Sequence, residues 1–219
     1  MTEYVLPDQG RRMTAEEEQD TEDTFKEFAE LVIWRNIFGI HWEEVARLLL
    51  PTSRNTFQFM SFNWPGQKKT EEQIDATGML ALQRFTAICD SLLTPRNMTW
   101  HGLTASDPAL ARSRRVKLWF EQVTRILFQQ RYAPTANFPG QNHANYTQLG
   151  AFGTCAMFTD DFIDQFGRPN GLRYRSIPLG ELFIKENHQG LIDGFIRWYK
   201  LTAQQAYNEF GPENLPEQL

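Results

Sequence analysis

The sequence has no long hydrophobic run. None of its 219 residues lie in a stretch that approaches the roughly 20 apolar residues a helix needs to cross a bilayer. Residues 1–10 also lack the basic-then-apolar order of a secretory signal peptide. We therefore expect a chain that is made in the cytoplasm and has no membrane partner. The two cysteines, Cys89 and Cys155, lie within apolar segments, which favours buried thiols in a reducing compartment over a disulfide or a metal pair.

The motifs of common enzyme classes are missing too. The chain contains neither glycine pattern that binds nucleotide phosphates, GxxxxGKS/T or GxGxxG, and no GxSxG nucleophile elbow. It also lacks internal repeats and low-complexity tracts. The residues alone therefore show no visible active site, and we expect no catalytic residue, no cofactor and no metal.

Basic residues are scarce at the start of the chain. Residues 1–30 contain ten acidic side chains against three basic ones, a net charge of −7, whereas the whole chain carries −5 and the remainder about +2. A body so close to neutral argues against a protein that holds nucleic acid through phosphate contacts. Acidic residues at a helix start are typical of a solvated N-terminus, where the helix dipole favours negative charge.

Apolar residues recur at helical spacing through the first two thirds of the chain. A capping box at 14–17 predicts a helix start, and Pro51 predicts its end. Further helices are expected over 71–93, over 107–132 with an Asp-Pro start, and over 142–152. The expected inner faces are Leu31, Trp34, Phe38, Trp42, Val45 and Leu49 in the first helix, Ala81, Phe85, Ile88 and Leu92 in the second, and Val116, Trp119, Phe120, Val123, Ile126 and Leu127 in the third.

After residue 153 the period changes to two. Strands are expected over 154–159, 172–177, 182–184 and 192–198, with a turn at 187–190, and Thr202 caps a short last helix that Gly211 ends. Long amphipathic helices followed by a small antiparallel sheet and a short helix make an α+β fold. The expected regions are a disordered N-terminus over 1–13, a mainly helical region over 14–152, and a small antiparallel β region with its closing helix over 153–219.

Three sets of polar residues could carry chemistry, but each lacks something that the chemistry needs. His41 and Glu44 lie three apart on a helix without a third or fourth ligand, so a surface pair is favoured over a metal site. Asp160, Asp161 and Asp164 could hold a divalent cation, but they lack the calcium-loop spacing, and a solvated loop is favoured. The remaining candidates, without a positioned nucleophile, are the scattered histidines His101, His143 and His188.

A basic cluster and four aromatic residues stand out in the helical region. Arg112, Arg114, Arg115 and Lys117 could contact phosphates or a neighbouring subunit's carboxylates, although a solvated helix face is the simpler interpretation. For the aromatic residues we expect core positions, with interface anchors in an oligomer as the alternative. These residues are Trp34, Trp42, Trp119 and Phe120.

Several segments, in order along the chain, resemble one protein family. Residues 42–51 are similar to the end of that family's first helix, residues 75–95 to its D-x-T-G…A-L…L-T-x-P helix, and Trp100 to the tryptophan that follows. Residues 149–157 are similar to its L-G-x-x-G-T-x-A-M transition from helix to strand. The other matching segments are residues 172–181, with a Pro-Leu-Gly turn, and residues 187–205. On these segments the chain resembles the head-to-tail connecting (portal) proteins of short-tailed phages.

The resemblance implies a structural role in the virion and a protein that is not an enzyme. Portal proteins form rings, commonly dodecameric, at one capsid vertex, where a separate terminase pumps double-stranded DNA through the ring and tail proteins later dock. The expected partners are therefore copies of the same chain together with terminase, capsid and tail proteins, while DNA passes without sequence-specific binding. Family members are usually more than twice as long, so we expect a fragment that covers the outer, wing-like region. The Phe-Pro-Gly segment at 138–140 departs from the continuous helix expected there.

A ring that closes needs two different, complementary patches on each subunit. The acidic helix start and the basic cluster offer such a pair, and the hypothesis is that they meet across subunits. The residues of this predicted interface are Glu16, Glu17, Glu18, Arg112, Arg114 and Arg115. Two alternatives stay open. One is another phage virion or tail-adaptor interaction protein, and the other is a metal-dependent hydrolase built on the aspartates at 160–164 with His188.

Overall fold

The computed structural model describes residues 15–57, 68–70, 73, 75–163, 166–211 and 215. The N-terminus expected to be disordered, residues 1–13, lies outside the described residues, and so does Asp164. The contacts divide the chain into two compact units. One unit comprises residues 1–37 and 181–219, and the other comprises residues 38–180.

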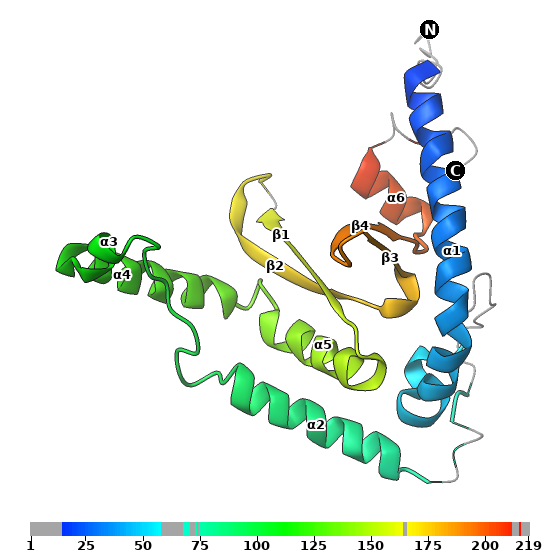
Figure 1. Cartoon of the computed structure of the whole chain (residues 1–219), viewed down its shortest axis with the longest axis horizontal. Coiled ribbons are helices and arrows are strands. Elements are labelled where there is room, and N and C mark those ends of the chain that lie inside the picture. The colour runs from blue at the N-terminus through cyan, green and yellow to red at the C-terminus, as the bar shows by residue number, and fades with distance from the viewer. Residues whose placement is uncertain are drawn as a thin grey trace, which may run out of the picture. The chain divides into compact units, whose positions relative to one another are not determined.

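The fold is α+β, as the sequence predicts (Figure 1). In the described residues the strands form two separate two-stranded antiparallel sheets, β1 with β2 and β3 with β4. None of the described helices is long and apolar enough to span a membrane. The elements, in chain order, are α1 (Ala15–Leu49), η1 (Pro51–Ser53), α2 (Thr77–Leu93), α3 (Pro108–Arg112), α4 (Arg114–Arg131), α5 (Phe138–Phe152), β1 (Ala156–Ile163), β2 (Pro169–Ile177), η2 (Leu179–Glu181), β3 (Leu182–Glu186), β4 (Ile192–Arg197) and α6 (Ala203–Phe210).

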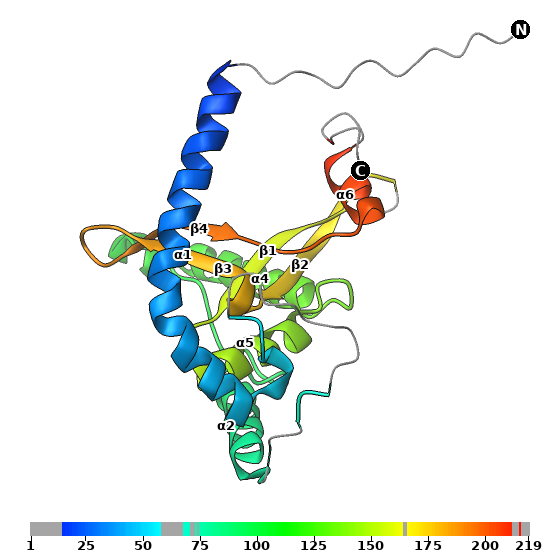
Figure 2. The same cartoon turned by 90° about the vertical axis from the view of Figure 1, so that its right-hand side faces the viewer.

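In the unit formed by residues 38–180, helix α5 lies between helix α2 and the β1–β2 ribbon (Figure 1). The two strands pair from Ala156 opposite Ile177 to Asp161 opposite Leu172, and a bulge follows before Ile163. Figure 2 shows this ribbon as long and twisted, as expected for a pair of strands with no other neighbours in the sheet.

Side chains of β2 alternate between the two faces of the ribbon, as the sequence predicts. Tyr174 and Ser176 contact α5: the Tyr174 ring lies 5.0 Å from the Phe138 ring, and Ser176 hydrogen-bonds to side chains of α5. Arg173 and Arg175 point to the other face and are exposed. One face of the ribbon is therefore fixed to a helix, while Arg173 and Arg175 on the other face are exposed.

Helix α5 begins four residues earlier than predicted. Phe138 is its first residue, and Pro139 lies in the first turn, where a missing N–H costs no intrahelical hydrogen bond. The start predicted at residue 142 is therefore wrong, because the helix already includes the Phe-Pro-Gly segment at 138–140. Gly153, with φ +74°, ends the helix and donates its N–H to the carbonyl of Leu149 at 2.9 Å.

A hydrophobic cluster around Phe57 joins the end of α1 to the end of α5. Phe57 is 1% exposed, and its ring lies 4.9 Å from the Phe152 ring and 5.7 Å from the Trp42 ring. Ala46, one turn beyond Trp42, is fully buried. Trp42 thus lies at a packed position, as predicted.

The unit formed by residues 1–37 and 181–219 is centred on Phe28 of α1. Its ring lies 4.8 Å from Phe183 of β3 in an edge arrangement and is stacked at 5.5 Å on Trp198. The guanidinium of Arg35 lies 4.3 Å from the centroid of the Phe183 ring, and its burial lowers its pKa to about 10. Lys185 forms an ion pair with Glu27 of α1. The β3–β4 hairpin is thereby fixed to the first part of α1.

Helix α2 is shorter than predicted. It begins at Thr77 and not at residue 71. The carboxylate of Asp75 accepts hydrogen bonds from the N–H and the hydroxyl of Thr77, at 3.1 and 2.9 Å. This local hydrogen bonding gives the backbone an alternative to the helical conformation before residue 77, and the helix therefore begins at Thr77.

The buried face of α2 also differs from the prediction. Leu82 and Thr86 are 7% and 0% exposed. The Thr86 hydroxyl donates to the carbonyl of Leu82 at 2.9 Å and lies 3.3 Å from the hydroxyl oxygen of Thr147 in α5. A satisfied polar group therefore takes the contact position that an apolar stripe was expected to occupy. Of the residues predicted to face inward, Phe85 lies against Gly150 of α5 but stays 43% exposed, and Ala81, Ile88 and Leu92 are exposed.

The helix predicted over 107–132 is divided in two. The Asp107 cap is confirmed, because its carboxylate accepts the N–H of Ala109 at 2.8 Å. Ser113, with ψ 124°, is extended, ends α3 and precedes α4. In α4, Thr124 is 7% exposed, whereas Ile126 is 46% exposed, so the inner face is narrower than predicted.

Candidate subunit interface

The basic cluster occupies the junction of α3 and α4. Arg112 ends α3, and Arg114, Arg115 and Lys117 lie in the first turn of α4; all four are exposed. Within the described ranges, none of the four takes part in a salt bridge. Their charges therefore face solvent in this part of the chain.

Three of these cations, Arg114, Arg115 and Lys117, lie at the unfavourable end of a helix. The first turn of α4 has no acidic residue, and the Ser113 side chain makes no capping hydrogen bond. The positive end of the helix dipole disfavours a nearby cation by about 0.3–1 kcal/mol. Carboxylates supplied from outside this segment would reverse that local cost.

An exposed apolar patch continues from the basic cluster along α4. Leu118 and Trp119 are 55% and 58% exposed, one turn beyond Arg115. The residues that line a shallow depression here are Arg114, Arg115, Leu118, Trp119 and Gln122. The expectation that Trp119 is a core residue is wrong for this chain, and tryptophan beside arginine is the composition of interface hot spots.

The acidic half of the predicted interface lies at the start of α1. Glu18 is exposed, whereas the side chains of Glu16 and Glu17 lie outside the described ones. Nearby, Glu22 and Asp23 lie 3.9 and 2.9 Å from the Lys26 ammonium. Residues 16–30 contain eight carboxylates and one lysine, so this helix start is strongly negative. It belongs to one unit of the chain and the basic cluster to the other.

The other aromatic residues predicted in the core behave differently from one another. Trp34 and Phe38 of α1 are 68% and 54% exposed, so their predicted core positions are wrong. Phe120 is half-buried, and its ring lies 4.9 Å from the Trp119 ring. Helical spacing identified a stripe on α1 but not which residues are covered.

Amide side chains fix α5 to the β ribbon. The Ser176 N–H donates to Gln141 Oε1 at 2.7 Å, and its hydroxyl donates to Asn145 Oδ1 at 2.6 Å. Gln148 Nε2 donates to the Ser176 hydroxyl at 2.9 Å, and Gln148 Oε1 accepts the N–H of Leu179 at 2.8 Å. Sequence reasoning missed this seam; its signal is three amides at helical spacings of four and three residues.

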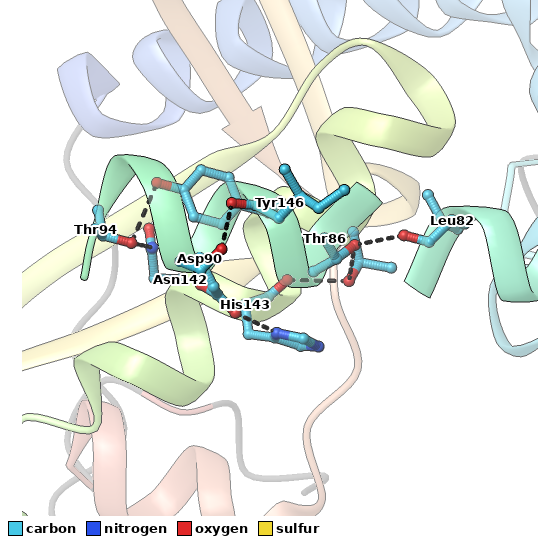
Figure 3. A network of polar contacts seen from close by, with 10 residues as sticks. Leu82, Thr86, Asp90, Thr94, Asn142, His143 and Tyr146 are labelled. Atoms are coloured by element: carbon cyan, nitrogen blue, oxygen red, sulfur yellow. Dashed lines mark hydrogen bonds and ion pairs between the residues drawn. The ribbon is translucent and has the colours of Figure 1, made fainter. Parts of the chain in front are cut away.

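A second polar seam joins α5 to α2 (Figure 3). His143 Nδ1 lies 2.5 Å from Asp90 Oδ2. The Thr94 hydroxyl oxygen accepts hydrogen bonds from Asn142 Nδ2 at 3.0 Å and from the Tyr146 hydroxyl at 3.4 Å. Because hydrogen bonds are directional, two such seams fix the register of α5 against both neighbours more closely than apolar contacts alone.

The C-terminal end of α4 is held by Arg131. Its guanidinium carbon lies 4.9 Å from the Trp100 ring centroid and 5.4 Å from that of Phe138. Trp100 Nε1 donates to the Tyr132 hydroxyl at 3.1 Å. Burial, and to a lesser extent Arg131, lowers the pKa of His101 in the same cluster. The exposed face of α4 is therefore presented by a helix whose far end is anchored.

The residues considered for metal binding do not converge within the described ranges. His41 and Glu44 are exposed on α1. Asp160 and Asp161 lie within β1 and not in the predicted loop, and Asp160 accepts a hydrogen bond from Arg173 at 2.9 Å. In this part of the chain no group of three His, Cys, Asp or Glu side chains could hold a metal ion. His188 is exposed, and the cysteines Cys89 and Cys155 are free and half-buried.

Comparison with known proteins gives matches over nearly the whole chain. The family described as bacteriophage head to tail connecting protein matches residues 21–219. The probable portal protein of Bordetella phage BPP-1 is 30% identical over 173 residues, which cover 79% of this chain and 30% of that protein. The portal protein of Salmonella phage epsilon15 is 26% identical over 200 residues, which cover 90% of this chain and 34% of that protein. The chain thus spans about a third of the length of these curated relatives.

Proposed function

Because the chain belongs to the bacteriophage head to tail connecting protein family, as the resemblance in its sequence implied, we propose that it forms part of a portal subunit. In this role, copies of the subunit close into a ring at one capsid vertex, and the phage DNA enters and leaves through the ring. The observation that carries the proposal is the family match over residues 21–219 together with two relatives named as portal proteins.

A scaffold role fits the physical character of the folded chain. The polar seams on both sides of α5 specify geometry, because each hydrogen bond requires one orientation of two elements. Repeated copies can close into a ring only if every subunit presents its contact surfaces at the same angle. The proposed task is therefore to hold a shape, without a reaction centre of its own.

The proposed partners follow from that task. The subunit contacts further copies of itself, twelve in the ring we propose, and the complete portal works with terminase, capsid and tail proteins. Double-stranded DNA passes through without sequence-specific binding, and the net charge of −5 keeps general attraction to phosphates low. The subunit is made in the host cytoplasm and resides in the virion.

We further propose that the acidic start of α1 and the basic cluster at the junction of α3 and α4 meet between neighbouring copies. The cluster has no salt bridge in the described part of the chain, and the α1 start has an excess of carboxylates. The residues assigned to this contact are Glu16, Glu17, Glu18, Arg112, Arg114 and Arg115.

Native mass measurement and negative-stain imaging of the purified chain test the proposal. The expected result is one closed assembly with a central hole and a mass that is a whole multiple of the 25.5 kDa chain. A chain that stays monomeric at its highest attainable concentration, or that joins only to a different virion protein, contradicts it. The second outcome would instead support a tail-adaptor role.

A further inference from the structure

Two exposed helix stripes have the same residue spacing. On α4, Arg115 is followed by Trp119, Gln122 and Ile126 at intervals of four, three and four residues. On α1, Glu18 is followed at the same intervals by the residues that make up its stripe, Glu22, Phe25 and Ala29. Because residues at these intervals share one side of a helix, each set forms a straight stripe of about three turns.

The α4 stripe has the character of a protein contact. Trp119 and its neighbour Leu118 are more than half exposed, Ile126 is 46% exposed, and Arg115 stands at the N-terminal end. Exposed apolar side chains grouped beside arginine mark partner surfaces. A surface for DNA phosphates would not need a tryptophan and a leucine between its cations.

The α1 stripe complements it in both charge and polarity. Its N-terminal end carries the exposed carboxylates Glu18 and Glu22, and it then becomes apolar at Phe25, which is 61% exposed, and at Ala29. The buried side of this part of α1 is a different one, marked by Phe28. The stripe is therefore left uncovered by the β3–β4 hairpin that packs on Phe28.

We infer that the α4 stripe of one copy packs along the α1 stripe of a second copy, with the two helices parallel. In this arrangement the carboxylates of Glu18 and Glu22 face Arg115 and the cations beside it, and Trp119 packs against Phe25. The parallel direction follows from the charges, since the acidic end of one stripe and the basic end of the other are both N-terminal. It also places carboxylates where the first turn of α4 has none. The inference rests on the proposed function and names the helix pair that joins its subunits.

Trp119 is the anchor of this contact. Its replacement by alanine should weaken association by at least about 30-fold, the effect expected for a central interface tryptophan. Arg115→Glu should weaken association at low salt. The double change Glu18→Lys and Glu22→Lys should also weaken association, because it reverses the charge at the acidic end of the α1 stripe. Arg84→Glu, a matched reversal on an exposed position of α2, should leave assembly unchanged.

A mixing experiment separates a contact between copies from a contact within one chain. One variant carries Arg115→Glu and Trp119→Ala and keeps its α1 stripe; the other carries Glu18→Lys and Glu22→Lys and keeps its α4 stripe. Each variant alone should remain monomeric by native mass measurement, with an unchanged circular dichroism spectrum. Their mixture should form dimers of one copy of each and nothing larger, because one intact stripe per copy joins two copies and then stops.

The outcomes distinguish this inference from the proposed function. If both variants still form rings like those of the unchanged chain, or if their mixture stays monomeric while the unchanged chain assembles, the helix pairing is wrong and the ring stands. If the unchanged chain forms open chains that both variants abolish, the pairing stands and the closed ring is wrong. A chain that is monomeric in every form overturns both.

Discussion

Replacing Ser176 with alanine should destabilise the unit formed by residues 38–180 by about 2 kcal/mol. The hydroxyl of Ser176 donates to Asn145 Oδ1 at 2.6 Å and accepts from Gln148 Nε2 at 2.9 Å. Asn145 is only 7% exposed, so its oxygen would lose its partner without gaining water, at a cost of roughly 1–3 kcal/mol. Gln148 is half-buried and can partly recover through solvent, which keeps the sum near the middle of that range.

Thermal unfolding followed by near-ultraviolet circular dichroism measures the effect. For a chain of this size, about 2 kcal/mol corresponds to a fall in Tm of roughly 4–8 °C. Protein concentration must be the same in all samples, because association stabilises the folded chain. Ser91→Ala is the matched control: it removes the same hydroxyl from an exposed position of α2 and should change stability by less than about 0.5 kcal/mol.

A double variant decides whether the two side chains act together. Ser176→Ala combined with Asn145→Ala should cost at least about 0.5–1 kcal/mol less than the sum of the single changes, because the second change removes the stranded acceptor. If Ser176→Ala is as mild as Ser91→Ala, or if the two changes are simply additive, the α5–β2 seam does not fix this unit as we argue.

Three further predictions concern the same unit. Phe138→Ala should cost about 3–5 kcal/mol in urea unfolding, because the ring is 6% exposed and lies 5.0 Å from the Tyr174 ring; a loss below about 1 kcal/mol would refute its core role. In Gly150→Ala the new Cβ would lie 2.6 Å from a Phe85 ring carbon, and this clash should weaken the packing of α2 on α5 by about 1–3 kcal/mol. A gain in helix propensity of up to about 1 kcal/mol offsets part of this cost. Gly102→Ala is the control and should be neutral, because no atom lies within 4 Å of its Cβ. An NMR titration should give His101 a pKa below its ordinary value of 6.5. The contribution of the neutral His101 ring to stability is then complete above pH 6.5 and is lost as the pH falls through the folded-state pKa. A pKa at or above 6.5 would contradict the burial of His101 beside Arg131.

Local signals in the sequence predicted the capped ends and one turn correctly, although the starts of α2 and α5 were missed. The Asp107 cap is present, and Thr202 with Gln205 forms the capping box that starts α6. In the turn before β4, the side-chain oxygen Oδ1 of Asn187 accepts hydrogen bonds from the N–H of Gln189 and the N–H of Leu191. In each of these features the donor and the acceptor lie only a few positions apart, so a short segment of sequence contains both partners.

Buried faces were harder to predict, because they depend on distant partners. On α2 the covered position is Thr86, whose hydroxyl is satisfied by its own helix and by Thr147, 61 residues away. On α1 and α4, Trp34 and Trp119 follow a helical period but are exposed. An apolar stripe shows that a helix has a partner, but it does not show whether that partner lies in the same chain or in another.

The candidate interface was predicted by charge and not by shape. Counting charges located the acidic start of α1 and the basic cluster, and the structure leaves Glu18 and Arg115 exposed. The apolar part of the α4 surface could not be predicted, because Leu118 and Trp119 look like core residues until the fold shows that nothing in the described chain covers them.

The most direct test of the central claim is the native mass distribution of the purified chain beside that of its Trp119→Ala variant, at equal concentration and low salt. A portal-type scaffold predicts a single closed species of many copies for the unchanged chain and mainly monomers for the variant. Monomers in both samples would show that this fold does not build a ring.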